Sequence, residues 1–132
     1  MNKKLVVILL ILNLVLIFVG CIPRMSKMPD NFDSDLWRDS VEVSNIIYAA
    51  YNSNNNFLVE EEDIIKQYFK TYENRTYDNI DENKLISRIK KAYNNYNTFV
   101  IRKKLNLSLE ESEMELENSL MKLKELQNEL IQ

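Results

Sequence analysis

The fold is decided by residues 80–132, IDENKLISRIKKAYNNYNTFVIRKKLNLSLEESEMELENSLMKLKELQNELIQ. In the first half, apolar residues recur at the three- and four-residue spacing of one helix face: Leu85, Ile89, Ala92, Tyr93, Tyr96, Phe99 and Val100. In the second half, a leucine recurs every seven residues: Leu109, Leu116, Leu123 and Leu130. We expect two long helices. Asp81 caps the first, with Ile80 packing on Leu85 as a hydrophobic staple, and Ser108 opens the second in a capping box with Glu111.

The leucine heptad is compatible with two arrangements. It could form a coiled-coil zipper with a second chain or a partner helix, or fold back on the preceding helix as an antiparallel hairpin. The alternate seam positions are Glu113, Leu120 and Gln127, of which one is apolar, and a parallel dimer would need more. Basic residues 102–104 precede the turn and glutamates from Glu110 follow it, so a hairpin would pair them. We therefore favour the hairpin.

Glycine and proline are absent from Asn31 onward, because the single glycine is Gly20 and the two prolines are Pro23 and Pro29. Tight turns and β-hairpins normally need these residues, so about a hundred residues without them favour an all-α fold. Asparagine, which tolerates the left-handed backbone, is expected to serve in the turns. The sequence predicts a small bundle of about four helices behind an N-terminal signal peptide, with a heptad-patterned C-terminal helix.

Two more helices complete this bundle. The first begins at Asp33 or Ser34, either of which is a good N-cap, and ends in the asparagine-rich loop 52–56. The second spans about 59–72, with acidic residues in its first turn where the helix dipole favours them. Their apolar faces are formed by these residues: Leu36, Val43, Ile47 and Tyr51 in the first, and Ile64, Ile65, Tyr68, Phe69 and Tyr72 in the second.

The first 21 residues, MNKKLVVILLILNLVLIFVGC, have the layout of a secretory signal peptide. Lys3 and Lys4 precede an apolar run from Leu5 to Val19, and Gly20 stands before Cys21, the single cysteine of the chain. The alternative is an uncleaved transmembrane helix. The 15-residue run spans about 22 Å as a helix, whereas a bilayer core of about 30 Å needs roughly 20 apolar residues. This length favours a cleaved signal.

The stretch Phe18-Val19-Gly20-Cys21 resembles the lipobox of bacterial lipoproteins. The resemblance implies that Cys21 carries a diacylglyceryl thioether, that the chain is cut between Gly20 and Cys21, and that the new amine is acylated, with palmitate as a typical acyl chain. Phe18 and Val19 depart from the commonest lipobox residues, and such relaxed boxes resemble those of spirochaetes. With the Asn- and Lys-rich composition, the chain is similar to small plasmid- or prophage-encoded lipoproteins of Borrelia-type spirochaetes, among them the haemolysin accessory lipoproteins of prophage holin systems.

These boundaries divide the chain into a signal peptide at 1–20, the lipidated cysteine and a tether at 21–32, and a helical domain at 33–132. Cleavage removes two lysines and no acids, so 15 basic residues remain against 20 acidic ones. The acidic balance excludes a nucleic acid as partner, because phosphate binding needs a basic face. With its cysteine acylated, the domain has no intrachain disulfide and depends on packing for its stability.

The residues that usually carry catalysis are missing. The chain has no histidine, and its mature part has no glycine for a phosphate-binding loop or a nucleophile elbow. Loop 52–63 faintly resembles a calcium loop, but Phe57 stands where the sharp turn needs glycine, so we expect no metal site. Seven tyrosines fall mostly on apolar stripes, which favours packing at the edge of the core over a binding surface. We expect no enzyme and no cofactor.

Three functions remain open. The first is a lipid-anchored helical interaction module that binds a host or envelope protein at the cell surface or outer membrane. The second is an accessory of lysis or haemolysis that stabilises a small membrane-spanning partner. The third is an envelope spacer that forms homo-oligomers. All three need the membrane anchor at Cys21. The leucines at 109, 116, 123 and 130 are the candidate helix interface, within the chain or with a partner.

Overall fold

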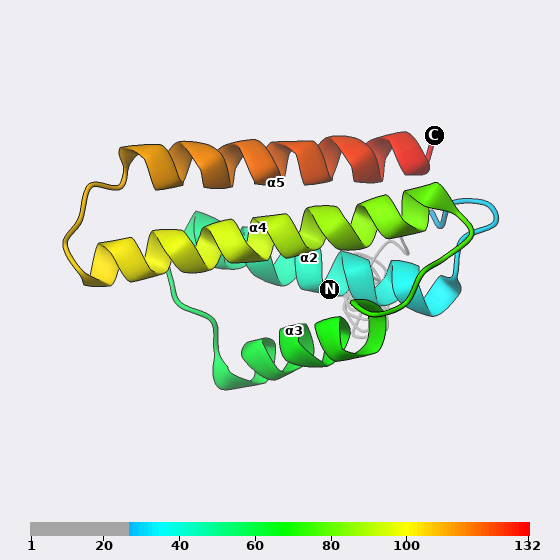
Figure 1. Ribbon diagram of the computed structural model, residues 1–132, viewed down its shortest axis with the longest axis horizontal. Coiled ribbons are helices and arrows are strands. Elements are labelled where there is room, and N and C mark those ends of the chain that lie inside the picture. Colours follow the sequence, from blue (N-terminus) through cyan, green and yellow to red (C-terminus); the bar gives the residue numbers. More distant parts are fainter. Residues whose placement is uncertain (1–26) are drawn as a thin grey trace, which may run out of the picture.

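The computed structural model describes residues 27–132, which form four α-helices and no strand. In chain order these are α2 (Ser34–Ser53), α3 (Val59–Tyr72), α4 (Ile80–Lys104) and α5 (Glu110–Leu130). Each helix runs opposite to the one before it along the chain (Figure 1). The predicted all-α class and the number of helices are confirmed.

The alternation of direction gives the bundle two distinct ends (Figure 1). Residues 27–33, the α3–α4 loop and the C-terminus lie at one end, which we call the tether end. The α2–α3 loop and the α4–α5 loop lie at the other, which we call the distal end. The chain therefore enters the bundle on the side opposite its two short loops.

The core is a single apolar cluster to which all four helices contribute. Its large, fully buried side chains are Leu36, Ile47, Ile65, Leu85, Ile89, Leu116 and Leu123. Burying one such side chain contributes about 1.5–3 kcal/mol relative to leaving it exposed. The helices closest to one another are α4 with α5, and α2 with both α3 and α4.

The N-terminus of α2 and its asparagine-rich end agree with the sequence. Asp33 is the N-cap, and its carboxylate accepts a hydrogen bond of 2.9 Å from the backbone of Leu36. At the other end, Asn54 adopts a left-handed conformation with φ of 56°. Asn106, in the α4–α5 turn, has φ of 53°, and Asn31 has φ of 57°. Asparagine thus supplies the left-handed positions that glycine takes in other proteins.

Both predicted caps of the long helices are wrong. The N-cap of α4 is Asn79, whose side chain accepts from the backbone of Asp81, so the helix begins two residues early. Ile80 is then 78% exposed and does not staple onto Leu85. No side chain caps α5, which begins at Glu110. The Ser108 carbonyl instead accepts from the Arg102 guanidinium at 2.8 Å, which keeps this segment in the turn.

The end of the predicted tether packs on the bundle. Pro29 and Phe32 are buried, and the Phe32 ring stands edge-on to the Trp37 ring with 5.6 Å between their centroids. The backbone of Asp33 donates to the buried carboxylate of Glu82 on α4. Residues 29–33 are therefore held against α2 and α4.

Candidate binding surfaces

The predicted lipidation site, Cys21, and the cleavage position after Gly20 lie outside the described residues. Both therefore stay predictions. Within residues 27–132, no helix combines the length and the apolar character needed to cross a membrane.

The heptad leucines of α5 are placed inside their own chain. Leu116 and Leu123 are fully buried, and Leu109 and Leu130 pack on the core while partly exposed. The helix lies along α4 for most of its length (Figure 1). The polar seam position Gln127 donates to the buried Ser44 hydroxyl of α2 at 3.0 Å. The whole leucine seam therefore faces this chain's own α2 and α4.

The predicted ion pairs between the end of α4 and the start of α5 do not form. In the described part of the chain, the ion pairs are Arg38 with Asp35 and Asp39, Lys66 with Glu62, and Lys90 with Glu73. At the end of α4, Arg102 binds a backbone carbonyl, and the Lys103 amine donates to the side chain of Asn54 at 2.7 Å. Residues 102–104 and the glutamates of α5 are therefore mostly exposed and have no ion-pair partner among residues 27–132.

Two of the tyrosines of α2 link this helix to α5. The Tyr48 hydroxyl donates to the backbone of Leu120 at 2.9 Å, and the Tyr51 hydroxyl donates to Glu117, so both join α2 to α5. Burial raises the pKa of Tyr48 to about 12. The hydrogen bond to Glu117, together with burial, raises the pKa of Tyr51 to about 12. Both hydroxyls therefore keep their protons to a higher pH than an ordinary tyrosine does, and they remain hydrogen-bond donors over that range.

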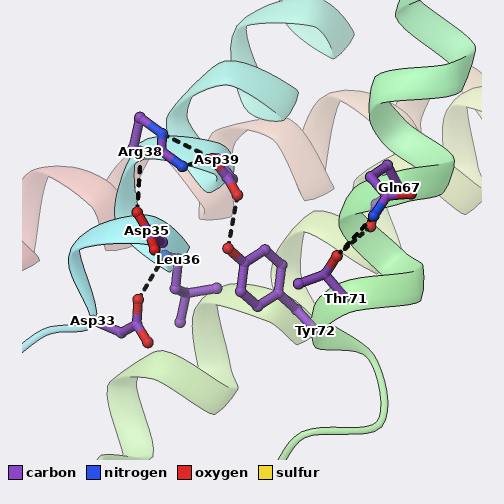
Figure 2. A network of polar contacts seen from close by, with 8 residues as sticks. All are labelled: Asp33, Asp35, Leu36, Arg38, Asp39, Gln67, Thr71 and Tyr72. Atoms are coloured by element: carbon purple, nitrogen blue, oxygen red, sulfur yellow. Dashed lines mark hydrogen bonds and ion pairs between the residues drawn. The ribbon is translucent and has the colours of Figure 1, made fainter.

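A first groove, of about 480 Å³, lies between α2 and α3. It is lined by Asp39, Glu42, Val43, Asp63, Ile64, Gln67, Tyr68 and Thr71. Figure 2 shows its edge, where the Tyr72 hydroxyl donates to Asp39 at 2.7 Å while Arg38 contacts the same carboxylate. The carboxylate of Asp39 is thus used to hold α3 on α2. Burial is the main reason that the pKa of Tyr72 is raised.

A second groove of about 480 Å³ lies at the distal end, between the start of α3 and the end of α4. Its lining is Asn56, Phe57, Val59, Glu62, Tyr96, Asn97, Val100, Ile101 and Lys104. Two residues of this lining, Val59 and Ile101, and three leucines of the two distal loops are between 48% and 75% exposed. We call this set the distal apolar surface: Leu58, Val59, Ile101, Leu105 and Leu107.

Sequence reasoning missed the distal apolar surface. Leu105 and Leu107 flank the turn residue Asn106 and lie outside both helical stripes, so no periodicity marks them. Val59 sits at the first position of α3, where its side chain is 75% exposed. The signal that could have found this surface is that Leu58, Leu105 and Leu107 stand in loops, where polar turn residues are usual.

Among residues 27–132, no three acidic, histidine or cysteine side chains gather closely enough to hold a metal ion. The chain matches no protein-family model, no curated protein and no solved structure.

Proposed function

We propose that this protein is a lipid-anchored, non-enzymatic interaction module of the cell envelope, which binds protein through its distal apolar surface. The observation that carries the proposal is the set of five aliphatic side chains left in water at one end of the bundle. Burying these side chains against a partner would contribute about 25 cal/mol of favourable free energy for each Å² of apolar area removed from water. Apolar side chains that gather at one exposed end are typical of interaction sites on soluble domains.

The position of this surface fits an anchor at Cys21. Residues 27–33 lie at the tether end, and the loops and helix ends that carry the distal apolar surface lie at the opposite end of the bundle (Figure 1). The six residues from 22 to 27 reach at most about 22 Å when extended. A lipid on Cys21 would therefore keep the tether end close to the membrane and present the distal end to other molecules.

Binding is better supported than catalysis by the chemistry of the two grooves. They are lined by carboxylates, amides, hydroxyls, aromatic rings and aliphatic side chains, together with Lys104. One of the carboxylates of the first groove, that of Asp39, already accepts from Tyr72 and Arg38. Because the chain has no histidine, neither groove offers the serine–histidine or cysteine–histidine pair that many hydrolases use.

Two experiments on the full chain in cells test the proposal. Metabolic labelling with a palmitate analogue should mark the wild type and leave Cys21→Ser unlabelled and uncleaved. A photo-crosslinking residue at Leu105 should capture a protein, whereas the same residue at Met121, an apolar side chain of similar exposure on α5, should not. Equal labelling of Cys21→Ser would refute the anchor, and the absence of crosslinks at Leu105 would refute the binding surface.

A further inference from the structure

We infer that the distal apolar surface binds a second copy of this chain, in a two-fold dimer that joins the end of α4 in each copy to the start of α5 in the other. The inference rests on the proposed function, because it names the partner of the same surface. It is carried by two charged patches at the distal end that have no ion-pair partners among residues 27–132. We call residues 102–104 the basic patch and the three glutamates at 110, 111 and 113 the acidic patch.

The two patches are adjacent in the chain and still unpaired. They flank a turn of five residues, 105–109, which is short enough to bring opposite charges into contact. Nevertheless, no ion pair within residues 27–132 involves either patch. Instead, Arg102 and Lys103 bind neutral oxygen atoms, of Ser108 and Asn54. The carboxylates of the acidic patch are therefore free to meet cations of another molecule.

A surface with both signs of charge on one end is complementary to itself. In a two-fold dimer, residue i of one copy contacts residue j of the other, and j contacts i. The basic patch of each copy can therefore face the acidic patch of its partner, which gives two sets of opposite charges from one axis. A membrane or a nucleic acid presents charge of one sign and would be repelled by the acidic patch. The second copy is thus the occupant that suits both patches.

The apolar side chains have counterparts in the same arrangement. Met114, directly after the acidic patch, is 64% exposed on α5. Leu105 and Leu107, directly after the basic patch, are 64% and 48% exposed. When the two patches meet, these leucines approach the methionine of the other copy, whose flexible thioether adapts to irregular apolar surfaces. The interface therefore has an apolar centre with ion pairs at its rim, as stable interfaces do.

The test is a charge exchange between two tagged full-length copies, co-expressed and then co-precipitated from a detergent extract. Tags are placed at the C-terminus, which lies at the tether end, away from the surface (Figure 1). One variant reverses the basic patch, with Lys103→Glu and Lys104→Glu, and the other reverses the acidic patch, with Glu110→Lys and Glu113→Lys. Wild-type copies should co-precipitate. Either variant paired with itself should lose about tenfold or more of the co-precipitated copy, because like charges then face each other.

The decisive sample combines the two variants. The reversed basic patch then faces the reversed acidic patch, so co-precipitation should return to the wild-type level. The matched control, Lys122→Glu with Lys124→Glu, makes the same change in charge on α5 away from the distal end and should pair as the wild type does. Far-ultraviolet dichroism of each variant checks folding, and Leu107→Asp, on an exposed side chain, should reduce pairing by an independent route.

Three results overturn the inference: wild-type copies that do not co-precipitate, a mixed pair that fails to recover while both variants are folded, or pairing that Leu107→Asp leaves unchanged. These results differ from failure of the proposed function. If Leu105 crosslinks to a different protein while the tagged copies do not pair, the surface binds a partner that is not a second copy. If Leu105 crosslinks to nothing, the surface itself is refuted.

Discussion

Ile89 provides the sharpest test of the core, because it lies in the middle of α4 and is fully buried. Ile89→Ala removes three carbon atoms, which costs about 2.4 kcal/mol in lost transfer free energy at about 0.8 kcal/mol each. The cavity that remains adds to this, because a packed core relaxes only in part, and the total for such substitutions is about 2–5 kcal/mol. For a domain of this size, a loss of about 3 kcal/mol lowers the melting temperature by roughly 12 °C.

The assay is thermal and urea unfolding of residues 21–132, made without lipid through Cys21→Ser and followed by far-ultraviolet dichroism. The matched control is Ile80→Ala on the same helix, because Ile80 is 78% exposed and lies outside the distal apolar surface, so its truncation should change the free energy of unfolding by less than about 0.5 kcal/mol. Equal losses in the two variants, or a loss below about 0.5 kcal/mol for Ile89→Ala, would show that α4 buries a different face.

Two further predictions concern α5 and the tyrosines. Leu123→Asp should unfold the chain, because it places an unpaired charge at a fully buried position. Removal of residues 107–132 should also unfold the chain, because it uncovers the apolar face of α4. A helical dichroism spectrum from either variant would contradict this packing. In an alkaline titration, the stability that Tyr48 and Tyr51 contribute should be fully present below pH 10 and be lost as the pH rises towards 12, because their folded pKa values of about 12 exceed the ordinary 10.0. Tyrosinate absorbance should rise together with the loss of helical dichroism, and ionisation of both hydroxyls near pH 10 in a folded chain would refute their role as protonated links.

The positions of the helices followed from the sequence wherever the deciding interactions are local. The Asp33 cap, the bounds 59–72 of α3 and the left-handed Asn54 all depend on a residue and its near neighbours along the chain. The predicted α4 cap is wrong because two competent cap residues, Asn79 and Asp81, stand two positions apart, and the side chain of the earlier one accepts the capping hydrogen bond. The predicted Ser108 cap is wrong because Ser108 lies in a turn whose backbone accepts a hydrogen bond from Arg102 of the preceding helix.

By itself, the sequence determined that residues from 33 onward form an all-α bundle of about four helices. The absence of glycine and proline disfavours tight turns and hairpins, and the spacing of apolar residues defines one face of each helix, and both effects are local to the chain. It also carries the whole basis for the lipid anchor at Cys21, which stays a prediction. Only the tertiary structure decided which charges pair and which aliphatic side chains remain in water. Contacts between helices depend on the rotation and the position of each helix relative to the others. The packing of all the core side chains together sets these quantities. The unpaired patches at 102–104 and 110–113 and the exposed leucines beside them are consequences of that packing.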